Sequence, residues 1–264
     1  MMVTRIIVTM LTIGAAAGVV AAGQHQPPAK PDHMQHRFDD PAKFAKSFDD
    51  PARDAWQLPS RVIEALGLKG GMAVADIGAG TGYFSTRLAR VTPDLTVYAA
   101  DIEPAMVEHL KTRAMSEHLM NVVPVLAGTA SPNLPKPVDV VLIVDTYHHI
   151  GNRAAYFRDL RKSLTPLGRV AIIDFRKDAP DGPPVEFRFT ADQIETEMKQ
   201  AGFRLEAKHD FLPRQHFLIF TINAIETGKY DPSLALKVAK LFGQLGRGEF
   251  FLDDAPAAEA DVVI

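Results

Sequence analysis

The chain contains no cysteine among its 264 residues, and this absence removes several kinds of chemistry. Disulfide bonds, thiolate metal sites, cysteine nucleophiles and lipid attachment at an N-terminal cysteine are excluded. A strong charge of one sign is also missing, because 29 Lys and Arg residues are balanced by 32 Asp and Glu residues, for a formal net charge of -3. Proteins that bind nucleic acids usually carry a basic surface or a high pI. We therefore expect no nucleic-acid partner.

The first 23 residues have the pattern of a targeting segment. Arg5 precedes an uncharged run over residues 6–22, which ends in small residues and is followed by polar ones. One positive charge, an apolar core and small residues at its end are typical of a signal peptide. The run is slightly short for a membrane span, which needs about 20 apolar residues. We predict that residues 1–23 form a signal peptide or a membrane anchor, so that the protein is exported to the periplasm or associates with a membrane.

The chain as a whole is 47% hydrophobic, and it is long enough to bury one full-sized core. Residues 24–50, which are rich in proline at their start, are predicted to be a linker. The hexapeptide FDDPAK at 38–43 recurs at 48–53 as FDDPAR, and we interpret the two copies as capped turns, since Asp before Pro favours turns and helix starts. The main domain is placed at residues 51–225. Residues 226–264 are predicted to form a C-terminal helix, over 233–245, and an acidic, disordered tail.

Strand-like and helix-like segments alternate from residue 72 onward. The predicted strands are 73–77, 96–100, 122–126, 138–144, 169–174, 204–209 and 216–222, and the predicted helices are 59–66, 82–90, 104–118, 153–164 and 191–201. Such alternation predicts a parallel sheet, and the short connection between the last two strands permits only an antiparallel pair. We predict an α/β fold with a doubly wound, mostly parallel, seven-stranded Rossmann-like sheet that ends in an antiparallel hairpin.

A glycine-rich turn follows the first predicted strand. The sequence DIGAGTG places Gly78, Gly80 and Gly82 at alternate positions after Asp76 and before a helix. Glycine permits positive φ angles and a close approach of a ligand to the backbone, and the helix N-terminus offers free N–H groups. The dinucleotide-binding pattern G-x-G-x-x-G is not met, because Tyr83 stands at its third glycine position.

This turn resembles the first motif of class I S-adenosylmethionine-dependent methyltransferases, and the resemblance covers about residues 50–222. It implies that Asp76 and the three glycines surround the methionine part of the cofactor. It also implies that Asp101, at the end of the second strand, accepts hydrogen bonds from the two ribose hydroxyls, and that Ile102 lies against the adenine ring. The family usually has an acidic residue after the third strand. Here the position falls at Thr129, which can still accept a hydrogen bond.

The segment DTYHH at 145–149 follows the fourth strand, where ligands of open α/β sheets bind. It is similar to the corresponding segment of small-molecule methyltransferases. We assign Asp145 to the cofactor, and His148 and His149 to catalysis, because an imidazole can remove a proton from the acceptor as the methyl group is transferred. Either histidine could instead only hydrogen-bond the loop backbone. Adjacent histidines do not project alike from one element, so no metal site is predicted.

The sequence thus predicts an S-adenosylmethionine-dependent methyltransferase that acts on a small molecule. Trp56 and Gln57, just before the first helix, are candidates for closing the cofactor side. Trp56 could instead only anchor that helix through hydrophobic contacts. Two other functions stay open. One is an NAD-dependent oxidoreductase on a Rossmann sheet, which would bind NAD. The other is a catalytically inactive cofactor-binding protein, which would bind S-adenosylmethionine without methyl transfer.

Overall fold

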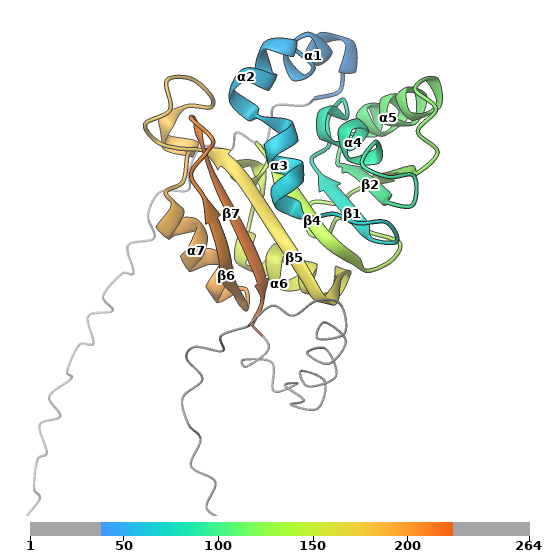
Figure 1. The fold of residues 1–264 in the computed structure, drawn as a ribbon. Coiled ribbons are helices and arrows are strands. Elements are labelled where there is room, and N and C mark those ends of the chain that lie inside the picture. Colours follow the sequence, from blue (N-terminus) through green and yellow to red (C-terminus); the bar gives the residue numbers. More distant parts are fainter. Residues whose placement is uncertain (1–37, 224–264) are drawn as a thin grey trace, which may run out of the picture. The chain divides into compact units, whose positions relative to one another are not determined.

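The structure, a computed structural model, describes residues 38–223, which contain one seven-stranded sheet with the order β3-β2-β1-β4-β5-β7-β6 (Figure 1). The strands are β1 (Ala73–Ile77), β2 (Thr96–Asp101), β3 (Val122–Leu126), β4 (Val138–Val144), β5 (Leu164–Phe175), β6 (Phe203–His209) and β7 (Gln215–Ile222). The first five strands pair in parallel, and β7 runs antiparallel to both β5 and β6. The predicted fold, a mostly parallel sheet that ends in an antiparallel hairpin, is confirmed.

Helices cover both faces of this sheet. They are α3 (Pro59–Leu66), α4 (Tyr83–Ala89) and α5 (Pro104–Ser116) on one face, and α6 (Arg153–Leu160) and α7 (Ala191–Gln200) on the other. Side chains of a strand alternate between the two faces, so that Val74 of β1 packs in the first core and its neighbour Ala75 in the second. Figure 1 shows α3 in front of the sheet and α6 behind it. Burial on both faces explains why the central strands are continuous apolar runs.

Residues 38–57, here called the N-terminal segment, form three short helices: α1 (Pro41–Phe48), η2 (Pro51–Arg53) and α2 (Asp54–Gln57). Asp40 caps α1 by accepting a hydrogen bond from the backbone N–H of Lys43 at 3.2 Å. Asp50 caps η2 in the same way, from the N–H of Ala52 at 2.8 Å. A proline opens each helix, where its missing N–H costs nothing. The two copies of the hexapeptide, interpreted from the sequence as capped turns, are therefore capped helix starts.

Two boundaries differ substantially from those predicted. Helix α1 lies within the region predicted as a linker, so the folded part of the chain begins before residue 51. The helix predicted over 153–164 ends at Leu160, and after the short helix η4 (Arg161–Ser163) Leu164 already pairs with Val138 of β4. The targeting segment and the helix predicted over 233–245 lie outside the described residues. Within residues 38–223, no helix is long and apolar enough to cross a membrane.

Candidate active site

A cavity of about 700 Å³ opens at the carboxyl ends of the parallel strands. Its walls come from the N-terminal segment, from the glycine turn after β1, from the ends of β2 and β5, and from residues 144–149 after β4. Figure 1 shows α1 and α2 at this end of the sheet, where the arrow of β5 finishes. Open α/β sheets bind their ligands at this edge. The cavity is therefore the candidate active site.

The glycine turn brings backbone to the cavity wall. Gly78, Gly80 and Gly82 have φ angles of +75°, +54° and +95°, which glycine adopts readily. A Cβ atom on Gly78 would lie 2.2 Å from Oγ1 of Thr146, so a larger residue does not fit there. Gly78 and Gly80 line the cavity. Gly82 precedes α4 and faces Leu110, whose Cδ2 would be 2.8 Å from an added Cβ.

Asp101, at the end of β2, lines the cavity and also holds the glycine turn. One carboxylate oxygen accepts a hydrogen bond from the backbone N–H of Gly80 at 2.8 Å, and the other accepts one from the N–H of Glu103 at 2.9 Å. Burial raises the pKa of Asp101, against the effect of these two bonds. The next residue, Ile102, is 48% exposed and lines the same cavity. Each Asp101 oxygen keeps a second lone pair for a ligand hydroxyl.

Asp76 is a buried carboxylate in the cavity wall, only 3% exposed. Burial raises its pKa to about 6, although a hydrogen bond from Ser85 and the charge of Arg53 favour the ionised form. The hydroxyl of Ser85 donates to Asp76 at 2.6 Å. A cationic group of a ligand would favour the ionised form further. The site is thus suited to a positively charged ligand.

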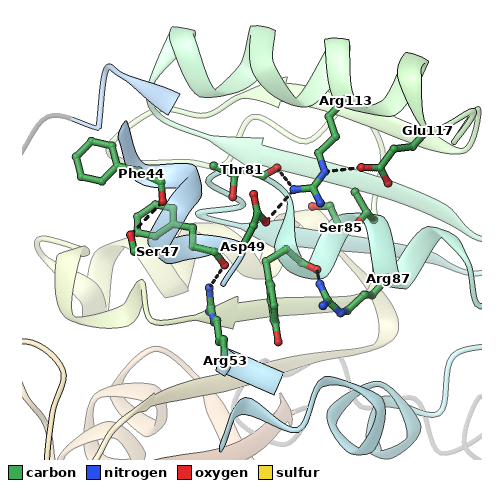
Figure 2. A network of polar contacts seen from close by, with 12 residues as sticks. Phe44, Ser47, Asp49, Arg53, Thr81, Ser85, Arg87, Arg113 and Glu117 are labelled. Carbon is green, nitrogen blue, oxygen red and sulfur yellow. Dashed lines mark hydrogen bonds and ion pairs between the residues drawn. The ribbon is translucent and has the colours of Figure 1, made fainter. Parts of the chain in front are cut away.

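The N-terminal segment closes one side of the cavity. The ring of Phe48 lies 3.2 Å from the position that a Cβ atom on Gly80 would take. Arg113 reaches over from α5, as Figure 2 shows, and donates to the carboxylate of Asp49 and to the carbonyl of Thr81, both at 2.8 Å. Arg113 therefore ties the N-terminal segment to the glycine turn.

A closed ring of hydrogen bonds, here called the Asp145 ring, ties the same segment to the sheet. Arg53 donates to one oxygen of Asp145 at 3.1 Å, and the amide of Gln215 donates to the other. Gln57 donates to Gln215 at 2.7 Å, and Arg53 donates to Gln57 at 3.1 Å, which closes the ring. Burial raises the pKa of Asp145 to about 7, against the opposing charge of Arg53. Both carboxylate oxygens of Asp145 are thus engaged by the protein.

His148 forms a close pair with Asp174, the penultimate residue of β5. The Nδ1 atom of His148 lies 3.0 Å from each oxygen of the Asp174 carboxylate. Both side chains are nearly inaccessible, at 8% and 2% exposure. Burial alone would lower the pKa of His148, but the hydrogen bond and charge of Asp174, with the charge of Asp145, raise it above its usual value despite Arg153.

His149 lies beside His148, with 4.1 Å between the ring centroids. Its ring meets that of Phe38 edge to face at 5.7 Å, and both residues line the cavity. Trp56 lines the cavity too and packs against Phe175 at 5.7 Å. In the described part of the chain, no three His, Asp or Glu side chains are grouped so as to hold a metal ion. The substrate side is thus a mainly aromatic wall around two imidazoles.

The structure brings most of the predicted site residues together. The cavity is lined by Asp76, Gly78, Gly80, Asp101, Ile102, Asp145, His148 and His149. Gly82 and Thr129 are not in its wall, and Thr129 is exposed after β3. The ligand contacts and catalytic roles assigned to all ten residues stay predictions.

Three residues of the site were not predicted from the sequence: Arg53, Asp174 and Gln215. A signal existed for two of them. Asp174 stands at the carboxyl end of a predicted parallel strand, as Asp76 and Asp101 nearly do. Gln215 begins the antiparallel strand β7, and it pairs with Phe175 at the end of β5. Its first residue therefore reaches the same edge of the sheet. Arg53 carried no such signal.

These features fit S-adenosylmethionine. The backbone of Gly78 and Gly80 would lie along the methionine part, where a side chain would fill the space. The Asp101 carboxylate can accept from a diol, and the buried Asp76 carboxylate favours a cation over an anion. The negatively charged phosphates of a dinucleotide would be repelled by these two carboxylates rather than attracted.

Comparisons with known proteins agree with this fit. Residues 68–226, more than half of the chain, match the family model of a methyltransferase domain. The solved structure of an S-adenosylmethionine-dependent methyltransferase from Aquifex aeolicus is 28% identical, with a TM-score of 0.64, over 69% of this chain and 98% of that one.

Two curated relatives are each 27% identical: phosphoethanolamine N-methyltransferase 1 of Triticum aestivum, over 59% of this chain, and a ubiquinone/menaquinone biosynthesis C-methyltransferase of a Shewanella strain, over 44%. The matches span only 31% and 47% of those two proteins. The glycine turn, the order of the strands and the match of the family model agree, and the chain belongs to the class I S-adenosylmethionine-dependent methyltransferases.

Proposed function

We propose that this protein transfers a methyl group from S-adenosylmethionine to a small-molecule acceptor, with His148 as the general base. One observation carries the proposal: a single cavity contains both the glycine turn with Asp101 and the paired imidazole of His148. Cofactor and acceptor could therefore meet in one cavity. When bound, S-adenosylmethionine supplies an electrophilic methyl group on its sulfonium sulfur.

The protein's own part is mainly alignment and exclusion of water. Gly78, Gly80 and Asp76 would hold the methionine part, and Asp101 would hold the ribose, with Ile102 against the adenine. Phe48 and Trp56 of the N-terminal segment cover the cavity. Their rings would keep water away from the reacting atoms.

His148 supplies an acid–base function in the cavity, and Asp174 orients its ring. It can take the proton of an acceptor atom as that atom gains the methyl group. His149 is the second candidate, because it lines the same wall. Thr129 stays a prediction for the adenine, and its exposed position after β3 would require the ligand to extend past the cavity.

The acceptor is proposed only as a small molecule. The names of the two curated relatives refer to methylation of nitrogen in one case and of carbon in the other. The cavity volume of about 700 Å³ and its aromatic wall support a compact, largely apolar acceptor. The balanced net charge of -3 supports no nucleic-acid partner.

Export is proposed from the sequence of residues 1–23 alone. A signal peptide would release the protein to the periplasm, and an uncleaved segment would attach it to the membrane. Fractionation of cells that express the full chain, with sequencing of the mature N-terminus, distinguishes the two. A protein that stays in the cytoplasm with Met1 in place would contradict both.

Calorimetry on the purified protein tests the cofactor. Binding of S-adenosylmethionine and S-adenosylhomocysteine, with none of NAD, is the expected result. Binding of NAD alone would favour the oxidoreductase. Transfer of a radiolabelled methyl group to small molecules of a cell extract tests the activity. Cofactor binding without any labelled product would indicate the inactive cofactor-binding protein.

A further inference from the structure

The pair formed by His148 and Asp174 indicates which nitrogen of the His148 ring carries the proton. Asp174 is 1% exposed, and each of its carboxylate oxygens already accepts a backbone hydrogen bond. The N–H of Phe175 donates to Oδ1 at 2.7 Å, and the N–H of His148 donates to Oδ2 at 3.0 Å. These two bonds fix the plane of the carboxylate. An ionised carboxylate held in this way can only accept further hydrogen bonds.

An acceptor group beside Nδ1 decides which ring nitrogen carries the proton. Both Asp174 oxygens lie 3.0 Å from Nδ1 of His148, so this nitrogen has to donate. In a neutral imidazole the other nitrogen, Nε2, then has a free lone pair. Among residues 38–223, no group hydrogen-bonds Nε2, and His148 lines the cavity.

We propose that Asp174 is a positioning residue that holds His148 in the Nδ1–H tautomer and thereby presents Nε2 to the cavity as the proton acceptor. The inference rests on the proposed function, and it narrows the acceptor to one whose reacting atom carries a hydrogen. As the bond from this atom to the methyl carbon formed, the bond from that carbon to the sulfonium sulfur would break and leave its electron pair on the sulfur. The bond from the acceptor atom to hydrogen would break, and the proton would go to Nε2. The imidazolium that results faces the Asp174 carboxylate, and the proton then leaves to water.

The charged groups around the ring agree with this role. Asp174 on β5 and Asp145 after β4 both favour the imidazolium, and Arg153 at the start of α6 opposes it. Two carboxylates thus stabilise the charge that the proton transfer creates. A tertiary amine or a thioether as acceptor would lose no proton on methylation, so it would need no base at His148.

Nitrogen NMR on the full chain, free of ligands, tests the inference. The protein is labelled with ¹⁵N-histidine and followed from pH 5 to pH 9, and the spectrum of His148→Gln identifies His148 among the nine histidines. We expect the Nδ1–H tautomer and a titration midpoint above the usual histidine value. Neutral His148 with its proton on Nε2 would overturn the inference in the wild type itself, without any variant at Asp174.

Asp174→Asn provides the second measurement. In this variant an amide NH₂, which can only donate, takes the place of one carboxylate oxygen. It has to face either Nδ1 of His148 or a backbone N–H. We therefore expect the proton of the neutral imidazole to move from Nδ1 to Nε2 and turnover to fall by about 10²–10⁴-fold. Asp178 is an exposed carboxylate just after β5, and Asp178→Asn is the matched control. It should change neither the tautomer of His148 nor the turnover. An unchanged tautomer in folded Asp174→Asn would refute the positioning role. Failure of the wild type to bind S-adenosylmethionine would instead refute the proposed function, and the tautomer would still be decided by NMR.

Discussion

Replacement of Asp76 by asparagine should make the ligand-free protein more stable at neutral pH. Asp76 is almost completely buried, and its pKa in the folded protein is about 6, against an ordinary value of 3.8. The folded protein therefore holds the proton more tightly than the unfolded chain does. This contribution to stability is complete below pH 3.8 and is lost as the pH rises through 6.

The expected size follows from the difference of about two pKa units, which corresponds to about 3 kcal/mol in the free energy of unfolding. Asparagine has nearly the same shape and carries no charge at any pH, so Asp76→Asn should not lose this stability. At pH 7.5 the variant should exceed the wild type by up to about 3 kcal/mol. The two should differ little near pH 4. The hydrogen bond from Ser85 can persist to the amide oxygen.

Urea unfolding at several pH values measures this difference, with Trp56, the only tryptophan, as the fluorescent probe. Asp178→Asn, which removes an exposed carboxylate, is the control and should follow the wild type. Binding of S-adenosylmethionine should be weaker in Asp76→Asn. The buried negative charge that destabilises the free protein would attract the positively charged ligand, and the variant lacks this charge. If wild type and variant lose stability in parallel between pH 4 and pH 7, Asp76 is not a buried charge of this kind.

Three further substitutions test other parts of the site. Asp101→Ala should weaken binding of S-adenosylmethionine by about 1.5–3 kcal/mol in calorimetry. It should also lower thermal stability, because the N–H groups of Gly80 and Glu103 lose their acceptor. Unchanged affinity would place the ribose contact elsewhere. Arg53→Met should open the Asp145 ring and speed proteolysis within residues 38–57. Lys43→Met, at the same place in the first hexapeptide, should not. Equal cleavage of the two variants would argue against the ring as the contact that holds this segment on the domain. His148→Ala should lower turnover by about 10²–10⁴-fold with affinity for the cofactor intact, and the wild-type rate should rise with pH through a midpoint above 6.5; the same pH dependence in both proteins would exclude His148 as the base.

The sheet could be predicted from the sequence because its central strands are buried on both faces. Three of the seven strands, β1, β3 and β4, have the predicted bounds. The start of β5 was missed because Pro166 and Gly168 interrupt its apolar pattern, and the pairing of Leu164 with Val138 comes from another part of the chain. Helix α1 was missed for a related reason. It has no buried residue of its own, and contacts with the domain, such as that of Phe48 with the glycine turn, hold it in place.

The site was predictable where it depends on a local pattern and not where it depends on pairing. Asp76 and Asp101 lie near the ends of their strands and His148 follows one, in an order that the sequence displays. The partner of His148 is 26 positions away, and the Asp145 ring joins residues up to 158 positions apart. Only the neighbourhood of β5 with β4 and β7 brings such residues into contact. Sequence reasoning could name His148 as a candidate base but not Asp174 as its partner.

The N-terminal segment has a practical consequence for how the protein is shortened. A chain that began at residue 51, the boundary suggested by the sequence, would keep every strand, both cores and Arg53. It would lose the rings of Phe38 and Phe48 from the cavity wall and the carboxylate that Arg113 holds. Such a protein would fold with an open, wetter active site, and poor activity in it would say little about the natural enzyme. The part of the chain predicted as a linker thus also forms part of the cavity wall.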